Sequence, residues 1–170
     1  MEVGLVKAFN IMVNNNFAII LARGGSKTIP NKNIKPLNNT NCVELTIKSL
    51  LNVFPPENIL LSSDSKDILN IGQKSNIMLL KRPKELSSDL ASSESAWLHA
   101  IYYLKDINIY PTTIIAPQVT SPLRYQDTLK KALKSFNQGK YDSLFSATEV
   151  SDHTFEWTVS KESDEIKAIN

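Results

Sequence analysis

Apolar residues along the chain form short continuous runs, and between these runs they recur every three or four positions. Short continuous runs are typical of strands buried on both faces, whereas the wider spacing is typical of amphipathic helices. The pattern predicts strands over residues 17–22, 58–63, 77–80, 112–116 and 143–148. It predicts helices over residues 43–51, 66–74, 92–105 and 125–138. Near the end, Phe155, Trp157 and Val159 alternate with other residues, which favours a hairpin arm or an edge strand.

Strands that alternate with helices along a chain usually form one mostly parallel sheet with helices on both faces. We therefore predict an α/β fold with three layers. In such a sheet, ligands bind outside the carboxyl ends of the strands. Polar clusters follow four of the predicted strands, at residues 22–33, 62–65, 81–93 and 117–124. The sequence therefore places a binding site at one edge of the sheet.

The composition narrows the classes of function. The chain has 170 residues, of which 42% are apolar and 21% charged, as in a folded globular domain. Its net charge of +2 is too small to indicate a nucleic-acid partner. No apolar run approaches the ~20 residues that span a bilayer. The single Cys42 excludes an internal disulfide, and the N-terminus lacks the basic start of a signal peptide, so we expect a cytoplasmic protein without a membrane partner.

The first polar cluster is Arg23-Gly24-Gly25-Ser26-Lys27, directly after a predicted strand, with Lys32-Asn33 after a turn at Pro30. Glycine lets backbone N–H groups approach anionic oxygens, and cationic side chains neutralise their charge. The spacing matches neither a Walker A loop nor G-x-G-x-x-G. A glycine turn with solvated cations is the alternative, but the return of Lys32 and Asn33 favours a loop folded around an anion.

Two further clusters offer groups for the opposite wall of the site. Arg82 stands beside a proline, and Ser92 and Ser93 open a predicted helix, whose N-terminus favours an anion or an acceptor. Gln118 and Thr120 follow a predicted strand and could contact a base or a sugar. Taken alone, these segments are also compatible with an ordinary helix cap and a proline-containing turn.

Acid–base or metal chemistry would depend on Asp64 and Asp89. No pair of His or Cys residues has the spacing of metal ligands, and Cys42 has no evident activating partner. Any Mg²⁺ would therefore need carboxylate and phosphate oxygens.

Together the clusters resemble the N-acylneuraminate (CMP-sialic acid) cytidylyltransferase family. The matching motifs appear in the family's order: Ala22-Arg23-Gly24-Gly25-Ser26-Lys27, Ile29-Pro30, Lys32-Asn33, Ser63-Asp64, Arg82-Pro83, Ala91-Ser92-Ser93, His99-Ala100, Gln118 and Thr120-Ser121-Pro122-Leu123-Arg124. The resemblance implies a Rossmann-like nucleotidyltransferase fold. It also implies transfer of CMP from CTP to an acidic nine-carbon sugar with release of pyrophosphate, Mg²⁺ as cofactor, and a homodimer.

The same resemblance assigns the site residues. Arg23, Lys27 and Lys32 would act in catalysis by holding phosphates. The CTP site would comprise Arg23, Gly24, Gly25, Ser26, Lys27, Lys32, Asn33, Arg82, Asp89, Ser92, Ser93, Gln118 and Thr120. The metal ligands stay unassigned, because the acidic pair that binds the metal in the family usually lies beyond the equivalent of Asn170.

The chain also departs from the family. Thr28 stands where a glycine is common, and Asn38-Asn39-Thr40 replaces a turn that usually contains glycine, although asparagine tolerates a positive φ. Since family members continue past the equivalent of Asn170, we expect a C-terminally truncated member. The expected organisation is an N-terminal extension over 1–16, a nucleotide-binding domain over 17–150, and the start of an arm or hairpin over 151–170.

Alternatives remain for the function. The acceptor could be a related acid sugar, such as legionaminic, pseudaminic or 3-deoxy-octulosonic acid. A non-catalytic alternative is an inactive nucleotide-binding remnant, or a module that acts with a partner subunit. A dehydrogenase is disfavoured because the dinucleotide glycine pattern is missing.

Overall fold

The computed structural model describes residues 16–26, 28–125, 127–139, 141–147, 157–159 and 166–168. The chain divides into two compact units, one ending at Leu133 and the other beginning at Lys134. Most of the N-terminal extension expected from the sequence lies outside the described residues, and Asn16 is the first residue of a strand. The domain boundaries proposed from the sequence stay predictions.

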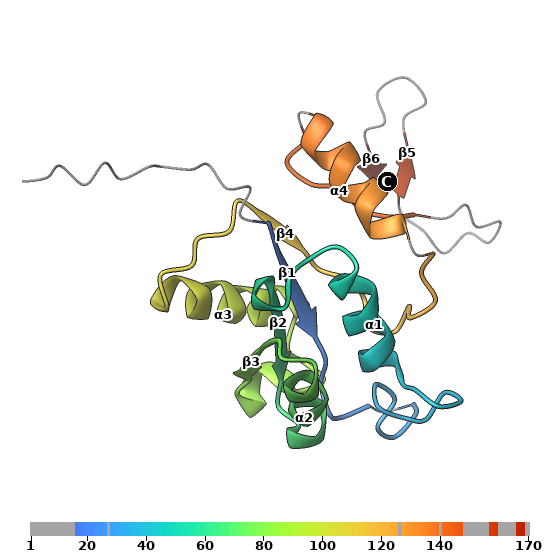
Figure 1. The fold of residues 1–170 in the computed structure, drawn as a ribbon, viewed down its shortest axis with the longest axis vertical. Coiled ribbons are helices and arrows are strands. Elements are labelled where there is room, and N and C mark those ends of the chain that lie inside the picture. Colours follow the sequence, from blue (N-terminus) through green and yellow to red (C-terminus); the bar gives the residue numbers. More distant parts are fainter. Residues whose placement is uncertain are drawn as a thin grey trace, which may run out of the picture. The chain divides into compact units, whose positions relative to one another are not determined.

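The first unit contains a four-stranded parallel sheet (Figure 1). Its strands lie in the order β3-β2-β1-β4, with bounds β1 (Asn16–Leu21), β2 (Ile59–Ser63), β3 (Met78–Lys81) and β4 (Thr113–Ile115). The register pairs Ala18 with Ile59 and Ile115. These elements confirm four of the predicted strands and the predicted parallel α/β sheet. The carboxyl ends of all four strands therefore point to one edge.

The helices follow the predicted order, with bounds α1 (Cys42–Leu51), α2 (Lys66–Lys74), α3 (Ser93–Asp106) and α4 (Thr128–Gln138). Two short 3-10 helices, η1 (Pro56–Asn58) and η2 (Lys84–Ser87), lie between them. Side-chain oxygens of Asn41, Ser65 and Ser92 accept backbone N–H bonds at the starts of α1, α2 and α3. Ser92 is thus a helix cap, which the sequence left open as one interpretation of this segment.

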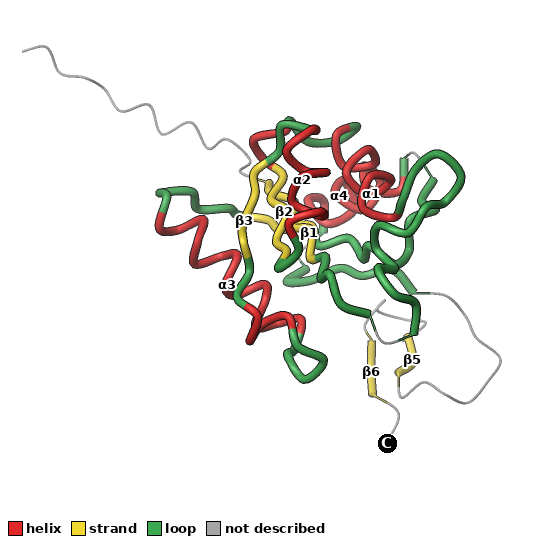
Figure 2. Tube along the Cα trace, turned by 90° about the horizontal axis from the view of Figure 1, so that it is seen from below, coloured by secondary structure: helices red, strands yellow, loops and turns green. Residues whose placement is uncertain are grey.

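Alternate residues of β1 enter two different cores, one on each face of the sheet. Ala18 and Ile20 pack with α1, whereas Phe17 and Ile19 pack with α3. Figure 2 shows α3 on one side of the strands and α1 and α2 on the other. All four β1 side chains are at most 1% exposed, and full burial of a large apolar side chain stabilises a fold by about 1.5–3 kcal/mol. These contacts form the three predicted layers and fix the sheet edge that carries the polar loops.

The fifth predicted strand, over residues 143–148, is wrong for the part that is described. Residues 143–147 form no strand, and Thr148 lies outside the described residues. A strand forms where a neighbour completes its hydrogen bonds, and no described strand pairs with this segment.

The second unit contains an antiparallel pair, β5 (Trp157–Val159) and β6 (Ile166–Ala168). This pair agrees with the hairpin expected from the alternating residues, although Phe155 lies outside the described residues.

Candidate functional site

The loop after β1 (Figure 1, blue) begins with a close backbone contact to the end of β2. The Gly24 N–H donates a 2.9 Å hydrogen bond to Oδ1 of Asp64. A Cβ atom at Gly24 would lie 2.9 Å from Cβ of Ser65, so only glycine fits this approach without a shift. A Cβ atom at Gly25 would meet nothing within 4 Å.

The turn at Pro30 folds the chain back towards Arg23. Asn31 adopts a φ of 53°, which asparagine tolerates, and its carbonyl accepts the N–H groups of residues 34 and 35. Asn33 is 8% exposed, and its Nδ2 donates to the Arg23 carbonyl at 2.9 Å. Its Oδ1 is buried without a hydrogen-bond partner among the described residues. The amide nitrogen of Asn33 therefore stabilises the loop, and its Oδ1 atom is left as an acceptor for a ligand.

Arg82 continues the sheet beyond β3, because its N–H donates to the Ser63 carbonyl at 2.8 Å. The side chain is only 6% exposed, and its Nε donates to Oγ of Ser87 at 3.0 Å. Burial lowers the pKa of the Arg82 guanidinium below its usual value, Asp64 opposes this by raising the pKa, and the charge of Arg23 lowers it further. Among the described residues, no carboxylate lies within ion-pair distance of Arg82. A buried charge of this kind is stabilised when an anion binds beside it.

Arg23 crosses from the first loop to the loop after η2. Its Nη1 lies 2.7 Å from Oδ1 of Asp89 and donates to the Ser88 carbonyl at 3.3 Å. Both side chains are more than a third exposed, so the pair stabilises the fold by only about 0.2–1 kcal/mol.

The N-terminus of α3 and the loop after β4 supply further polar groups. Oγ of Ser92 accepts the Ser95 N–H at 3.2 Å, and Ser93 begins the helix. The unpaired N–H groups and the dipole at this end favour an anion. Gln118 and Thr120 flank Val119, which is 3% exposed and anchors the loop in the core.

These segments enclose a pocket of about 320 Å³ at the carboxyl ends of the strands, a volume typical of small-molecule sites. Predicted site residues make up much of its lining: Arg23, Gly25, Ser26, Lys32, Asn33, Arg82, Asp89, Ser92, Ser93, Gln118 and Thr120. Among the described lining residues, three cationic side chains face one carboxylate, so the pocket favours an anion.

Two predicted site residues are not in that lining. Gly24 uses its N–H on Asp64, and Lys27 lies outside the described residues. Ser87 and Ser88 also line the pocket, from η2 and the turn after it, although neither was among the individually predicted site residues. Their place in the polar loop between Arg82 and Ser92 was the available signal.

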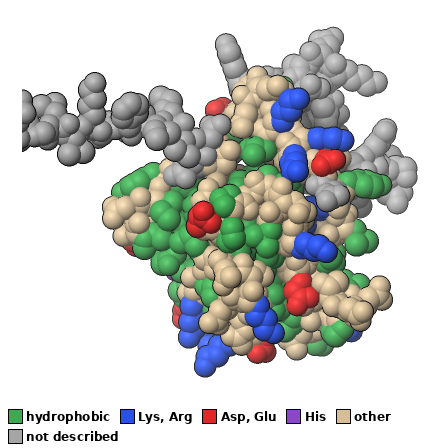
Figure 3. Space-filling view, viewed as in Figure 1, with side chains coloured by type: hydrophobic (Ala, Val, Ile, Leu, Met, Phe, Trp, Pro, Cys, Tyr) green, Lys and Arg blue, Asp and Glu red, His purple; other side chains and the backbone are tan. Residues whose placement is uncertain are grey.

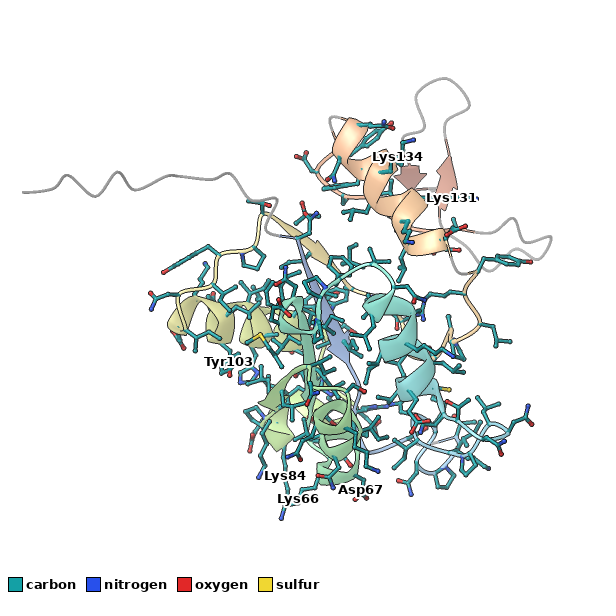
Figure 4. The ribbon with its side chains drawn as sticks, viewed as in Figure 1. Lys66, Asp67, Lys84, Tyr103, Lys131 and Lys134 are labelled. Atoms are coloured by element: carbon teal, nitrogen blue, oxygen red, sulfur yellow. The ribbon has the colours of Figure 1, made fainter. Side chains whose placement is uncertain are left out.

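Other exposed cations gather on the same unit but outside the pocket. Figure 3 shows Lys and Arg side chains at the lower edge of the first unit, where Figure 4 labels Lys66 and Lys84. Neither of these lysines lines the pocket. They provide matched controls for the cations that do.

The described residues do not by themselves form a metal centre. No group of three or more His, Cys, Asp or Glu side chains that could hold a metal occurs among them. The two candidate carboxylates are already engaged, Asp64 by the Gly24 N–H and Asp89 by Arg23. Separately, the helices that the structure describes are too short or too polar to cross a membrane.

Comparison with solved structures supports the fold. CMP:2-keto-3-deoxy-manno-octonic acid synthetase complexed with CTP superposes with a TM-score of 0.60 at 14% identity, covering 72% of this chain and 47% of that one. A cytidylyltransferase from Leptospira borgpetersenii superposes with a TM-score of 0.55 at 18% identity, covering 74% and 50%. At these identities the likeness shows a shared fold only.

Comparison with known sequences identifies the family as well as the fold. The chain is 36% identical over 135 residues to a pseudaminic acid cytidylyltransferase from Campylobacter jejuni, covering 79% of this chain and 58% of that protein. It is 32% identical over 140 residues to an N-acylneuraminate cytidylyltransferase from Oncorhynchus mykiss, covering 82% and 31%. The chain thus spans little more than half the length of the first relative and about a third of the length of the second. Residues 17–165 match the cytidylyltransferase family model, and the chain therefore belongs to the cytidylyltransferase family.

Proposed function

We propose that this chain forms the CTP-binding part of a cytidylyltransferase that transfers CMP to an acidic nine-carbon sugar. The anomeric hydroxyl oxygen of the sugar attacks the α-phosphorus and gives up its proton to solvent. The bond between the α-phosphorus and the oxygen that bridges to the β-phosphate breaks, and pyrophosphate leaves with that electron pair. The observation that carries the proposal is the cationic pocket at the carboxyl ends of the four parallel strands. Catalysis by such a site depends on positioning and on neutralising charge.

The triphosphate is proposed to lie along Arg23, Lys32 and Arg82. The buried guanidinium of Arg82 has no contacting carboxylate among the described residues, so phosphate oxygens would offset the cost of its burial. The N-terminus of α3 would add backbone N–H groups to the same anion. We keep Lys27 in this set as a prediction from the sequence.

The nucleoside is proposed to lie along Asn33, Gln118 and Thr120. The Oδ1 atom of Asn33 is a buried acceptor without a partner among the described residues, and a ribose hydroxyl or a base amino group could donate to it. The amide of Gln118 can donate and accept, as recognition of a base edge requires.

The acceptor is proposed to be sialic acid, as the sequence motifs suggested. Pseudaminic acid is the second candidate, because the Campylobacter jejuni relative named for that sugar has the higher identity of the two relatives compared. Both are acidic nine-carbon sugars, and the proposed CTP site would serve the reaction of either one.

An assay of pyrophosphate release tests the proposal. The purified chain is incubated with CTP, Mg²⁺ and one acid sugar from a panel of sialic, legionaminic, pseudaminic and 3-deoxy-octulosonic acids. Release that depends on one of the nine-carbon acids supports the proposal. Binding of CTP without release for any acid would favour a non-catalytic module or a chain that needs a partner subunit.

We also propose a homodimer, as the resemblance implied. Analytical ultracentrifugation decides this independently of catalysis, since a sedimenting species of monomer mass would contradict it.

A further inference from the structure

Asp64 stands where β2 ends, between two loops that line the pocket. Its Oδ1 accepts the Gly24 N–H at 2.9 Å, and this contact joins residues that are 40 positions apart. The sequence alone suggested acid–base or metal chemistry for this carboxylate. In the structure, one of its oxygens serves a backbone amide in the first loop.

The contact is tight because residue 24 has no side chain. The loop passes so close to the end of β2 that a Cβ atom at position 24 would meet Ser65 at 2.9 Å. The hydrogen bond to Asp64 and the packing against Ser65 therefore hold Gly24 from the same side. The neighbours on either side of it in the chain, Arg23 and Gly25, line the pocket.

Asp64 also acts on the loop after β3. Its negative charge opposes the burial cost of the Arg82 guanidinium and so keeps the pKa of that group from falling further. The backbone links the same elements, because the Arg82 N–H donates to the Ser63 carbonyl at 2.8 Å. One carboxylate thus supports cationic residues from two loops of the pocket.

We propose that Asp64 is a positioning residue, which holds the Gly24 backbone so that Arg23 and Gly25 face the nucleotide, and that it is not a metal ligand. The proposal rests on the proposed CTP site. A loop fixed before binding loses less conformational freedom when the phosphates arrive, and the affinity for CTP is higher for that reason.

The test compares Asp64→Asn with Asp64→Ala. Asparagine keeps an acceptor oxygen for Gly24 but is a poor metal ligand, whereas alanine removes both functions. The matched control is Asp67→Asn, which removes a charge three residues further on; Asp67 is exposed on α2 (Figure 4) and does not line the pocket. The readouts are hydrogen exchange at the Gly24 amide and the affinity for CTP with Mg²⁺ or with EDTA.

We expect Asp64→Ala to speed exchange at Gly24 and to weaken CTP binding by about tenfold or more, because a hydrogen bond to a charged group is lost. The loss is expected with Mg²⁺ and with EDTA alike. Asp64→Asn should stay within about threefold of the wild type in both readouts, since the acceptor for Gly24 is retained and only the support of the charge for Arg82 is lost. The control should match the wild type.

Two results would overturn the proposal. One is unchanged exchange at Gly24 in Asp64→Ala. The other is an Asp64→Asn protein that binds CTP as weakly as Asp64→Ala, with the loss confined to Mg²⁺, because that pattern marks a metal ligand. If the wild type binds no CTP, the proposed function fails, and the exchange comparison still decides whether Asp64 holds Gly24.

Discussion

Arg23 and Asp89 lie 66 positions apart in the sequence and form an ion pair, with 2.7 Å between Nη1 and Oδ1. Both line the pocket. The carboxylate therefore occupies one direction of approach to a guanidinium that we propose binds phosphate. A phosphate oxygen and the Asp89 oxygen would compete for the same N–H groups.

This competition predicts opposite effects for the two partners. Arg23→Ala should weaken CTP binding by about tenfold, since it removes a charge-assisted bond, whereas Asp89→Asn should strengthen binding by about threefold by releasing Arg23. Isothermal titration at low and high salt measures both, and the gain should shrink as salt rises. Weaker binding in Asp89→Asn would show instead that this carboxylate contacts the nucleotide or its metal.

Substitutions of the two adjacent glycines should have different effects, one on the stability of the fold and the other on CTP binding. Gly24→Ala should lower the free energy of unfolding by about 1–3 kcal/mol, because its methyl group meets Ser65 at 2.9 Å. Gly25→Ala should leave stability within about 1 kcal/mol, since the site is open and neither glycine has a positive φ. The methyl group added by Gly25→Ala would become part of the pocket lining and should weaken CTP binding. Urea denaturation and CTP titration of both variants check this, and equal loss of stability would contradict it.

The pocket lysine and a surface lysine should respond differently to the same change. Lys32→Ala should weaken CTP binding by about three- to tenfold and reduce its salt dependence, because Lys32 lines the pocket. Lys84→Ala removes an equal charge from the exposed edge labelled in Figure 4 and should leave CTP affinity within about twofold. Measuring the CTP affinity of both variants at two salt concentrations tests this difference. An equal loss of affinity in both variants would contradict it and indicate a general effect of charge.

The contacts of Arg124 predict that its side chain stabilises the fold. Its guanidinium donates to the Gln118 carbonyl and, at 3.5 Å, to Oγ1 of Thr46, which is buried in α1. Arg124→Gln should lower the free energy of unfolding by about 1–3 kcal/mol, as expected when partly buried bonds to a charged group are lost. Thermal unfolding monitored by circular dichroism measures this, and an unchanged midpoint would show that the contacts contribute little.

The elements of the first unit could be predicted because local signals agree with tertiary structure there. The run Phe17–Leu21 is apolar throughout, and β1 is buried on both faces. Ser92 precedes a helical pattern, and its hydroxyl caps α3. The parallel order then brings the polar loops to one edge, so most of the pocket lining could be predicted as well.

Contacts between distant segments could not be predicted in this way. The sequence shows Asp64 and Gly24 but not that one accepts the N–H of the other. It places Arg124 in a motif of the family but does not show that its guanidinium donates to a carbonyl and a hydroxyl. The apolar pattern at residues 143–147 resembles a strand, but no described strand pairs with it, and pairing is a property of the whole fold.

The central claim is that the pocket binds CTP through its phosphates. Calorimetric titration of the wild-type chain with CTP, CMP, cytidine and UTP tests it most directly. We expect affinity to fall in the order CTP, CMP, cytidine, and to be lower for UTP than for CTP. Equal affinity for CTP and cytidine, or no binding of CTP at all, would contradict the claim.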